Sequence, residues 1–358
     1  MHVNTRGRRA AAVGAVVTAG ALVLGACGSS GSADTNATTG ASDTTGASAA
    51  AGTQTKIAAI IKGLDNPFFQ TMEQGINDQA KAAGVPVTVQ AANSITDTTG
   101  QADKLNGLAG QDFSCYVVNP ISGTNLIQGL ARLSVLNKTV VNIDSPVDAT
   151  AAKSANVKLA TYIGTDNVQA GKMAGARMTE LVPAGGDLAV VGGIAGDVTS
   201  AARVEGFQQG IGPKLKVVQT VAANWDRQTA LTAATDVMRA NPNLAGFFVA
   251  NDDMGLGVAR AIANSGKTGK IKVISVDGIK DALEAVKAGT LDGTVAQYPY
   301  AIGLMGVEAC QAAATGKPLP PDVKAPVELV SKDTADKALA ATPKPFGAYD
   351  DPFKTLIQ

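Results

Sequence analysis

Residues 57–91 read IAAIIKGLDNPFFQTMEQGINDQAKAAGVPVTVQA, and the order of the patterns within them indicates a fold class. The small and β-branched apolar residues of Ile57–Lys62 predict a buried strand, and those of Val85–Ala91 predict a second one. Between them, Pro67–Ala83 has the length and spacing of an amphipathic helix, and Asn66 before a first-turn proline is a typical helix start. A strand, a helix and a strand in this order predict two parallel strands covered by the helix.

The same alternation continues along the chain. Further apolar runs of strand length are Phe113–Asn119, Thr139–Asp144, Lys158–Gly164, Asp187–Gly192, Lys216–Ala222, Leu244–Ala250, Ile271–Val276 and Gly293–Gln297. Segments with helical patterns between them include Asn125–Asn137, Val168–Leu181, Arg203–Ile211, Arg227–Arg239, Met254–Ser265 and Ala301–Ala314. Such strands alternating with helices predict an α/β fold with parallel sheets covered on both faces. About ten strands would make an unusually wide single sheet, so we expect two sheets in two lobes.

The N-terminal residues have the pattern of an export leader. Arg6, Arg8 and Arg9 precede an uncharged apolar run that ends at Cys27, and this run is a little short for a membrane-spanning helix. The ending resembles that of bacterial lipoprotein signal peptides, which implies that residues 1–26 are removed and that Cys27 is diacylated. The alternatives are an ordinary secretory signal cut nearby and a twin-arginine export route.

A segment without large apolar residues follows the leader. From Gly28 to Thr55 the chain has no Ile, Leu, Val, Met or aromatic residue. Such a segment cannot bury enough apolar area to offset its ordering entropy, so we expect residues 27–55 to be a flexible tether with a reach of roughly 30 Å. The expected location is outside the cytoplasm, at the outer face of the cell membrane, with the lipid as the sole anchor.

Composition excludes several classes of function. The chain has 30 Lys+Arg and 30 Asp+Glu among 358 residues, and no basic cluster interleaved with aromatic residues, so we expect no nucleic-acid partner. The one histidine, His2, lies in the leader, so the mature protein would have no imidazole. That excludes Ser-His-Asp and Cys-His catalysis and a histidine-ligated zinc ion. We predict no catalytic residue, no metal and no cofactor.

Side chains suited to binding follow the predicted strands. In open parallel α/β sheets, ligands bind beyond the carboxyl ends of the strands. The candidates at these ends are Lys62, Asn66, Phe68, Phe69, Asp144, Arg203, Trp225, Asn251, Asp277 and Gln297. Carboxylates, amides and cations bond hydroxyl groups, and flat rings cover the C–H faces of a sugar. The mixture therefore predicts a neutral polyhydroxylated ligand.

Eight motifs in order resemble one known family. They are KGLDNPFF from Lys62, VNP from Val118, IGTDNVQAG from Ile163, GDVTSAARVEGF from Gly196, NWDRQTAL from Asn224, ANDDMGLG from Ala250, VDG from Val276 and TVAQYP from Thr294. Together, over about residues 56–330, they resemble the ribose- and allose-type periplasmic sugar-binding proteins of ABC importers. The resemblance implies a monomer of two lobes that close around a small sugar and deliver it to a membrane permease.

The resemblance also implies where the lobes meet. The chain would cross between them near Tyr162, Tyr298 and Val327. The implied units are residues 56–161 plus 299–326 for the N-terminal lobe, 162–298 plus 327–345 for the C-terminal lobe, and 346–358 for a C-terminal extension. That extension has no clear period, and we expect it either to lie over the body or to be partly disordered.

Each candidate side chain has an implied role. Phe68 and Phe69 would form one aromatic wall, and Trp225 would stack from the opposite lobe. The polar members would bond ligand hydroxyls: Lys62, Asn66, Asp144, Arg203, Asn251, Asp277 and Gln297. Ribose-type members have Asp-Arg where this chain has Asp144-Ser145, so ribose itself is doubtful. An allose-like hexose, another pentose, or a pentitol or tetritol such as xylitol or threitol remains open.

Plainer interpretations stay open beside these roles. The aromatic candidates could be core residues, Asp144 and Asp277 could cap turns, and Arg203 could form a surface salt bridge. Asp252 and Asp253 are expected to cap the following helix. Cys115 and Cys310 lie in an apolar strand and an apolar helix, so the default expectation is two buried thiols. Because the family's chain path returns the second helix to the first lobe, a disulfide is the alternative.

Three other functions remain as alternatives. A sensor subunit would present the bound sugar to a receptor. A secreted glycosidase would use Asp144 and Asp277 as paired carboxylates, although no other motif supports it. A cytoplasmic sugar-responsive repressor would need a DNA-binding headpiece, and the leader occupies that place.

Overall fold

The computed structural model describes residues 55–358, so the predicted signal peptide, Cys27 and nearly all of the predicted tether lie outside the described residues. Within the described part the strands form two six-stranded sheets. The first has the order β11-β5-β4-β3-β1-β2, with bounds Asp322–Ala325, Thr161–Thr165, Thr139–Ile143, Cys115–Val118, Ile57–Ile61 and Val87–Ala91. The second has the order β12-β10-β9-β8-β6-β7, with bounds Val327–Val330, Gly293–Gln297, Lys272–Asp277, Gly246–Val249, Gly186–Gly192 and Leu215–Ala222.

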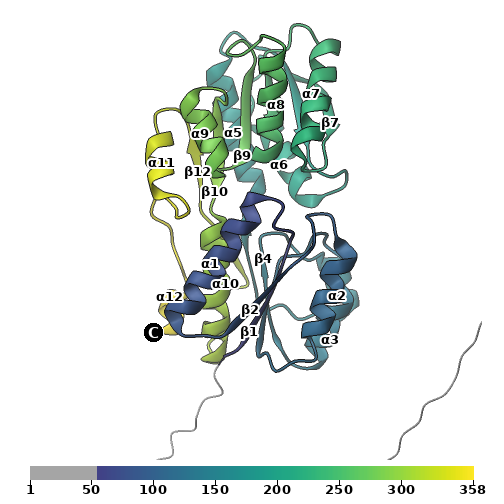
Figure 1. Ribbon diagram of the computed structural model, residues 1–358, viewed down its shortest axis with the longest axis vertical. Helices are drawn as coiled ribbons and strands as arrows, with labels where there is room; N and C mark the ends of the chain where they lie inside the picture. The colour runs from purple at the N-terminus through teal and green to yellow at the C-terminus, as the bar shows by residue number, and fades with distance from the viewer. Residues whose placement is uncertain (1–54) are drawn as a thin grey trace, which may run out of the picture. The chain divides into compact units, whose positions relative to one another are not determined.

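Helices cover both faces of each sheet (Figure 1). The helices of lobe 1, which we define by the first sheet, are α1 (Pro67–Ala83), α2 (Thr98–Leu108), α3 (Ile127–Val135), α4 (Ala149–Ser154), α10 (Pro299–Ala314) and α12 (Lys354–Ile357). Those of lobe 2, defined by the second sheet, are α5 (Asn167–Leu181), α6 (Val198–Gly210), α7 (Arg227–Ala240), α8 (Asp252–Asn264), α9 (Lys280–Ala288) and α11 (Ala335–Ala341). All strand pairs are parallel except β10 with β12. The predicted two-lobed α/β fold is confirmed.

Strand β1 shows why its sequence is apolar at every position. Ile57, Ala59 and Ile61 belong to the hydrophobic cluster that includes residues of α1 and α10. Ala58 and Ile60 belong to a separate cluster that includes residues of α2 and α3. Since successive side chains of a strand point to opposite faces, a strand between two helix layers is apolar throughout.

In its described part the chain passes between the sheets three times. The first passage follows Thr165 instead of lying near Tyr162, because β5 stays paired with β4 and β11 in the first sheet. The second lies between Gln297 and Pro299, and the third between Ala325 and Val327. The last two strands, β11 and β12, were not predicted, because these edge strands contain charged residues and are not continuous apolar runs.

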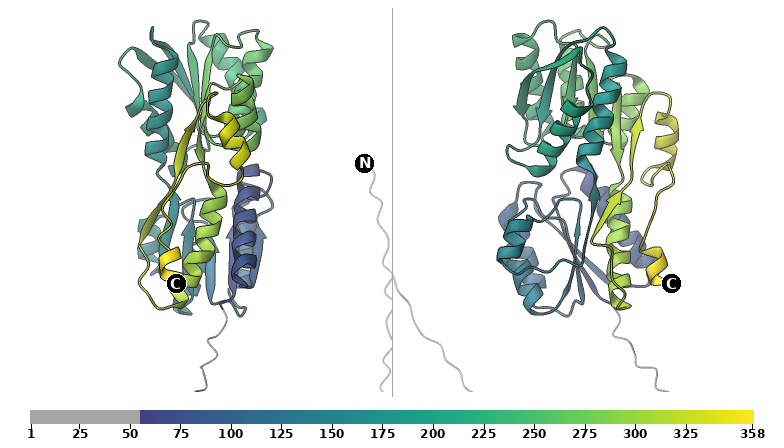
Figure 2. Two further views of the ribbon diagram at one scale, coloured as in Figure 1. Left: turned by 90° about the vertical axis from the view of Figure 1, so that its left-hand side faces the viewer. Right: turned by 180° about the vertical axis from the view of Figure 1, so that it is seen from behind.

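Residues 342–358 pack against the body, which decides between the two expectations for this segment. The segment leaves α11, which contacts α9 of lobe 2, and ends at α12, which contacts α10 of lobe 1 (Figure 2). Along the way the ring of Phe346 lies edge-on to that of Tyr298, with centroids 6.3 Å apart. Phe353 is fully buried. The C-terminal segment therefore connects the two lobes once more.

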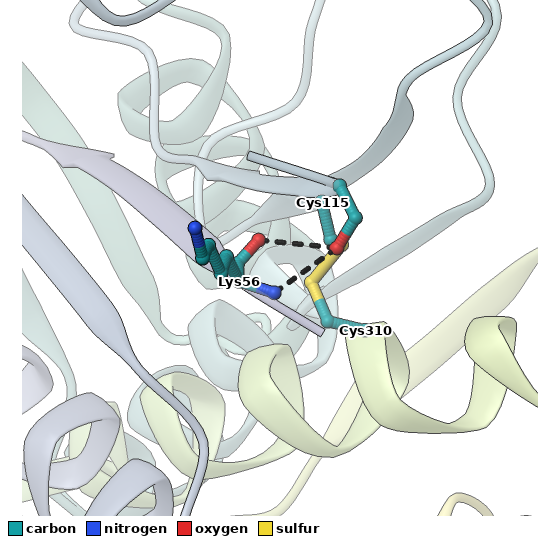
Figure 3. Close-up of a disulfide and its surroundings, with 4 residues drawn as sticks. Lys56, Cys115 and Cys310 are labelled. Carbon is teal, nitrogen blue, oxygen red and sulfur yellow. Dashed lines mark hydrogen bonds between the residues drawn. A yellow bond between two sulfur atoms is a disulfide. The ribbon is translucent and has the colours of Figure 1, made fainter. Parts of the chain in front are cut away.

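A disulfide joins Cys115 of β3 to Cys310 of α10 (Figure 3). The default expectation of two free thiols is thus wrong, and the alternative is confirmed. The Cα atoms are 5.8 Å apart, within the usual range for a disulfide, because α10 lies directly on the sheet of lobe 1. Beside it, Ser114 Oγ donates to the carbonyl of Lys56 at 3.2 Å and accepts from its N–H at 3.1 Å. No helix within residues 55–358 has the length and apolarity that crossing a membrane requires.

Candidate ligand-binding site

The carboxyl ends of strands from both sheets border one cavity. With its open mouth it encloses about 530 Å³. Nine of the ten predicted side chains line it: Lys62, Asn66, Phe68, Phe69, Asp144, Arg203, Trp225, Asn251 and Asp277. The structure thus brings together residues that are up to 215 positions apart, 277 minus 62, in the sequence.

Six further residues of the lining were not among the candidates. They are Ile95, Ile121, Ser145, Ile194, Asp197 and Thr199. Five of them lie in loops that follow strands, and Thr199 lies in the first turn of α6. Only a position near the end of a strand could have indicated that these residues line the site. The three isoleucines in particular have no chemistry that distinguishes a site residue from a core residue.

Lobe 1 supplies an aromatic corner at the start of α1. The Oδ1 atom of Asn66 accepts a hydrogen bond from the Phe68 N–H at 2.9 Å, which caps the helix and leaves the Asn66 amide NH₂ free to donate. Phe68 and Phe69 pack edge to face, with centroids 5.2 Å apart. Both rings are more than nine-tenths buried and belong to the hydrophobic core as well as to the cavity wall.

A chain of three polar side chains continues this wall. Lys62 Nζ donates to Ser145 Oγ at 2.7 Å, and Ser145 Oγ donates to Asp144 Oδ2 at 3.2 Å. The Lys62 ammonium also lies 5.4 Å from the centre of the Phe69 ring. At the position where ribose-type proteins have arginine, Ser145 after β4 therefore bonds the Lys62 ammonium, which follows β1 on the far side of β3. One positive charge is retained there, without the planar fork of a guanidinium.

Asp144 has a strained backbone that a neighbouring tyrosine supports. Its φ is +57°, in the left-handed region. The Tyr162 hydroxyl donates to the Asp144 carbonyl at 2.6 Å. Burial, with a further contribution from the Asp144 charge, raises the pKa of Tyr162, so this hydroxyl stays a donor at neutral pH.

Arg203 forms the polar centre of lobe 2. It is only 4% exposed, so the surface salt-bridge interpretation is wrong. Nε donates to Asn167 Oδ1 at 2.8 Å, and Nη1 donates to the Ala250 carbonyl at 2.7 Å and to Asp277 Oδ1 at 3.2 Å. None of the described hydrogen bonds uses Nη2. Its two N–H groups therefore remain for a ligand, since Arg203 lines the cavity.

Asp277 lies against Arg203 with a strained backbone of its own. Its φ is +142°, and its side chain is almost fully buried. Burial raises the pKa of Asp277 to about 8, and the Arg203 guanidinium and the Gln297 amide oppose that rise. Gln297 is the predicted residue that does not line the main cavity. Its Nε2 donates to Asp277 Oδ1 at 2.7 Å, and it borders a second cavity on the other side of Asp277.

The turn after Asp277 is fixed by the fully buried Asp252. Its carboxylate accepts from the backbone N–H groups of Gly278 at 2.6 Å and Ile279 at 2.9 Å. It also accepts from the Ser275 hydroxyl at 2.5 Å and the Thr294 hydroxyl at 2.7 Å. The expectation that Asp252 caps a helix is therefore wrong, because its four donors lie around β9 and β10.

The cap of α8 is Asn251, whose Oδ1 accepts from the Met254 N–H at 3.0 Å. The amide NH₂ of Asn251 is left to donate at the cavity wall, as at the start of α1 in lobe 1. Asp253, also expected to cap, instead pairs with Arg227 at 2.8 Å.

Trp225 completes the wall of lobe 2. The Arg203 guanidinium lies 5.7 Å from the centre of the indole ring, and the φ of Trp225 is +63°. Asp144, Trp225 and Asp277 are thus three of only six described non-glycine residues with positive φ. Backbone strain of this kind clusters at functional sites, where the surrounding structure enforces it. The three strained residues therefore support the same cavity as the site.

The charges around the cavity are mixed. Its lining contains the cations Lys62 and Arg203 and the acidic residues Asp144, Asp197 and Asp277. Within residues 55–358 no group of three or more His, Cys, Asp or Glu side chains could hold a metal ion. Donors and acceptors of both signs beside flat rings suit an uncharged ligand with several hydroxyl groups.

Comparison with known proteins identifies the family. Residues 57–318 match the family described as the periplasmic binding protein domain, and the chain belongs to that family. It is a family of solute-binding proteins and not of enzymes. The D-allose-binding periplasmic protein of Escherichia coli is 37% identical over 273 residues, covering 75% of this chain and 88% of that protein. The ribose import binding protein RbsB of Bacillus subtilis is 31% identical, covering 76% of this chain and 86% of that protein.

Two further relatives extend the comparison. The xylitol-binding protein of Mycolicibacterium smegmatis is 28% identical over 332 residues, covering 91% of this chain and 87% of that protein. Among solved structures, an ABC transporter periplasmic solute-binding protein from Actinobacillus succinogenes with bound D-allose superposes with a TM-score of 0.75 and 28% identity. That match covers 79% of this chain and 99% of the other.

Proposed function

We propose that this protein is the extracytoplasmic solute-binding component of an ABC importer, which binds a small neutral monosaccharide or sugar alcohol and delivers it to a permease. The observation that carries this proposal is the cavity between facing strand ends, in which Phe68, Phe69 and Trp225 lie beside charged side chains of both signs. Membership in the periplasmic binding protein family and the sugar-binding relatives support it.

The binding energy would favour closure of the two lobes. A ligand that contacts Asp144 of lobe 1 and both Arg203 and Asp277 of lobe 2 has more partners when the lobes are closed than when they are apart. A ligand shifts a conformational equilibrium by its differential affinity for the two states, so these contacts stabilise the closed form. Closure about a hinge is the general behaviour of periplasmic binding proteins, and the closed form is what a permease would recognise.

The ligand we propose is an allose-like hexose, a pentose other than ribose, or a pentitol or tetritol such as xylitol or threitol. We expect ribose to bind weakly because of Ser145. The cation near Asp144 is the single ammonium of Lys62, which Ser145 bonds, and not a guanidinium with its planar set of donors. The relatives named for D-allose and for xylitol support the hexose and polyol alternatives.

A thermal-shift panel of pentoses, hexoses and alditols tests the proposal. Binding to the native state stabilises it by about 2.7 kcal/mol at a ligand concentration of 100 Kd, so a true ligand raises the melting temperature by several degrees. We expect at least one of D-allose, xylitol and threitol to do so, and ribose to have a weaker effect. Trp225→Ala is the control, because loss of the indole should weaken binding and so reduce the shift. A panel in which no sugar or alditol alters the melting temperature contradicts the proposal.

The lipid anchor is a separate part of the proposal, and it rests on the sequence alone. We propose that Cys27 is diacylated and holds the protein at the outer face of the membrane. We expect Cys27→Ala to move the protein from the membrane fraction to the soluble fraction and to prevent labelling with radioactive palmitate. If the variant stays membrane-bound, Cys27 is not the anchor.

A further inference from the structure

Trp225 is the sole tryptophan of the chain, and its backbone has a conformation that non-glycine residues seldom adopt. Asn224 and Trp225 have φ of +56° and +63°, so two successive non-glycine residues lie in the left-handed region. Neighbouring structure must hold them there, because the left-handed conformation is costly for such residues. The indole ring faces the cavity only while that support persists.

Gly193 lies directly beneath the indole. It is the first residue after β6, and a Cβ atom built on it would overlap the Cδ2, Cε2 and Cζ2 atoms of the Trp225 ring. Any side chain at residue 193 would therefore push the ring away. The φ of Gly193 is not in the positive region, so the close approach of the indole, and not backbone conformation, requires glycine here.

Hydrogen bonds fix Gly193 in turn. Its N–H donates to Ser200 Oγ at 2.8 Å, and Ser200 lies buried in the first turn of α6. Its carbonyl accepts from the Asn224 N–H at 3.3 Å, and the Ala223 N–H donates to the Gly192 carbonyl at 2.8 Å. The loops after β6 and β7 are thus joined to each other at the base of the ring.

We propose that Gly193 is a positioning residue that sets the plane of the Trp225 indole and thereby the affinity of the site for a sugar ring. This inference rests on the proposed function. Stacking depends on the ring lying parallel to the C–H face of the ligand, so a displaced indole loses that contact even though it is still present. Ser200 supports Gly193 and has the same role to a smaller degree.

The first test needs no ligand. Because Trp225 is the sole tryptophan, its fluorescence reports its own surroundings. We expect Gly193→Ala to change the emission maximum and to increase acrylamide quenching at least about twofold. Gly107→Ala is the control, because nothing lies within 4 Å of a Cβ added at Gly107. Unchanged emission and quenching in Gly193→Ala would overturn the proposal, whatever the protein binds.

The second test uses calorimetry with D-allose and xylitol as probes. We expect Gly193→Ala to weaken binding at least about tenfold, and to have less than a twofold effect when Trp225→Ala is already present. An equal loss in both backgrounds would show that Gly193 acts without Trp225 and would overturn the proposal. If the wild-type protein binds no sugar, the proposed function is wrong. The fluorescence result still tests whether Gly193 positions the Trp225 indole.

Folding of the variant is checked by circular dichroism. Should Gly193→Ala fail to fold, Ser200→Ala replaces it, because that change frees the Gly193 N–H without adding an atom near the ring. We then expect increased acrylamide quenching of Trp225 and a threefold or greater loss of probe affinity relative to the wild type. Quenching identical to that of the wild type would contradict the proposal.

Discussion

The two lobes have the same architecture, but they hold their halves of the site in different ways. Lobe 1 is cross-linked by Cys115–Cys310, while lobe 2 contains no cysteine. Lobe 2 instead buries the charged pair of Arg203 and Asp277, whose separation is 3.2 Å. In lobe 1 the corresponding cation, Lys62, is only partly buried and is held by one hydroxyl. The comparison indicates that the disulfide and Lys62 of lobe 1 separate stability from binding, whereas Arg203 of lobe 2 contributes to both.

The largest expected effect is that of removing the disulfide from lobe 1. The bond closes a loop with a sequence separation of 195, and loss of a native disulfide typically costs about 2–5 kcal/mol. We expect Cys115→Ser combined with Cys310→Ser to lower the free energy of unfolding by about 4 kcal/mol in urea titrations. Cys115 begins β3, whereas the site lies at carboxyl ends, so sugar affinity should change less than about twofold. A loss of affinity without a loss of stability would contradict the separation of stability from binding in lobe 1.

The next effect concerns the buried pair of lobe 2. Arg203→Met removes the guanidinium and leaves the buried oxygens that it bonds, on Asn167, Ala250 and Asp277, without that donor. This should lower the free energy of unfolding by about 3 kcal/mol and abolish measurable binding. Lys62→Met is the matched change in lobe 1. Because Lys62 is partly exposed, we expect it to cost about 1 kcal/mol or less in urea titrations while still weakening binding. Equal losses of stability in the two variants would remove the proposed difference between the lobes.

The smallest effect is a dependence of stability on pH. A carboxyl group whose pKa is raised in the folded state stabilises that state fully below its unfolded pKa and loses this contribution as pH rises through the folded pKa. For Asp277 this window extends from about 4 to about 8. The slope from one such group is at most about 1.4 kcal/mol per pH unit. We therefore expect Asp277→Asn to flatten the decline in melting temperature between pH 6 and pH 8.

Lobe 1 has a counterpart to this group. Burial and the neighbouring carboxyl of Asp351 raise the pKa of Glu308 on α10, while the Lys354 ammonium opposes the rise. Its contribution is lost with rising pH in the same direction as that of Asp277. Glu308→Gln should therefore also flatten the decline in melting temperature with pH. Its effect should add to that of Asp277→Asn. A double variant with the slope of the wild type would show that neither carboxyl group titrates in this range.

The sequence predicts the bounds of α1 and the strand-end positions of Asp144 and Asp277 because each depends on local chemistry, whereas α2 and α9 were not among the named helical segments. Helix α1 has the predicted bounds, since Asn66 caps its start and Gly84 ends it in the left-handed conformation that glycine adopts readily. Asp144 and Asp277 follow apolar strands, and parallel strands bring their carboxyl ends to one edge of a sheet. These features need no knowledge of strand order.

Other features depend on packing that the sequence does not state. Gln297 ends its strand as the other candidates do, but β10 lies between β9 and the edge strand β12, so its side chain reaches Asp277 and not the main cavity. The isoleucines of the cavity wall resemble core residues in every respect. The disulfide requires knowing that α10, which follows lobe 2 in the chain, returns to lie on β3.

That return has a consequence for a chain cut by a protease. Every peptide bond of lobe 2 from β6 to β10 lies between the two cysteines, so a single cut there leaves both pieces covalently attached. Such nicked protein would run as one species on a gel without reductant and as two with it. A cut in a surface loop between β6 and β10 would therefore release neither fragment while the disulfide is intact.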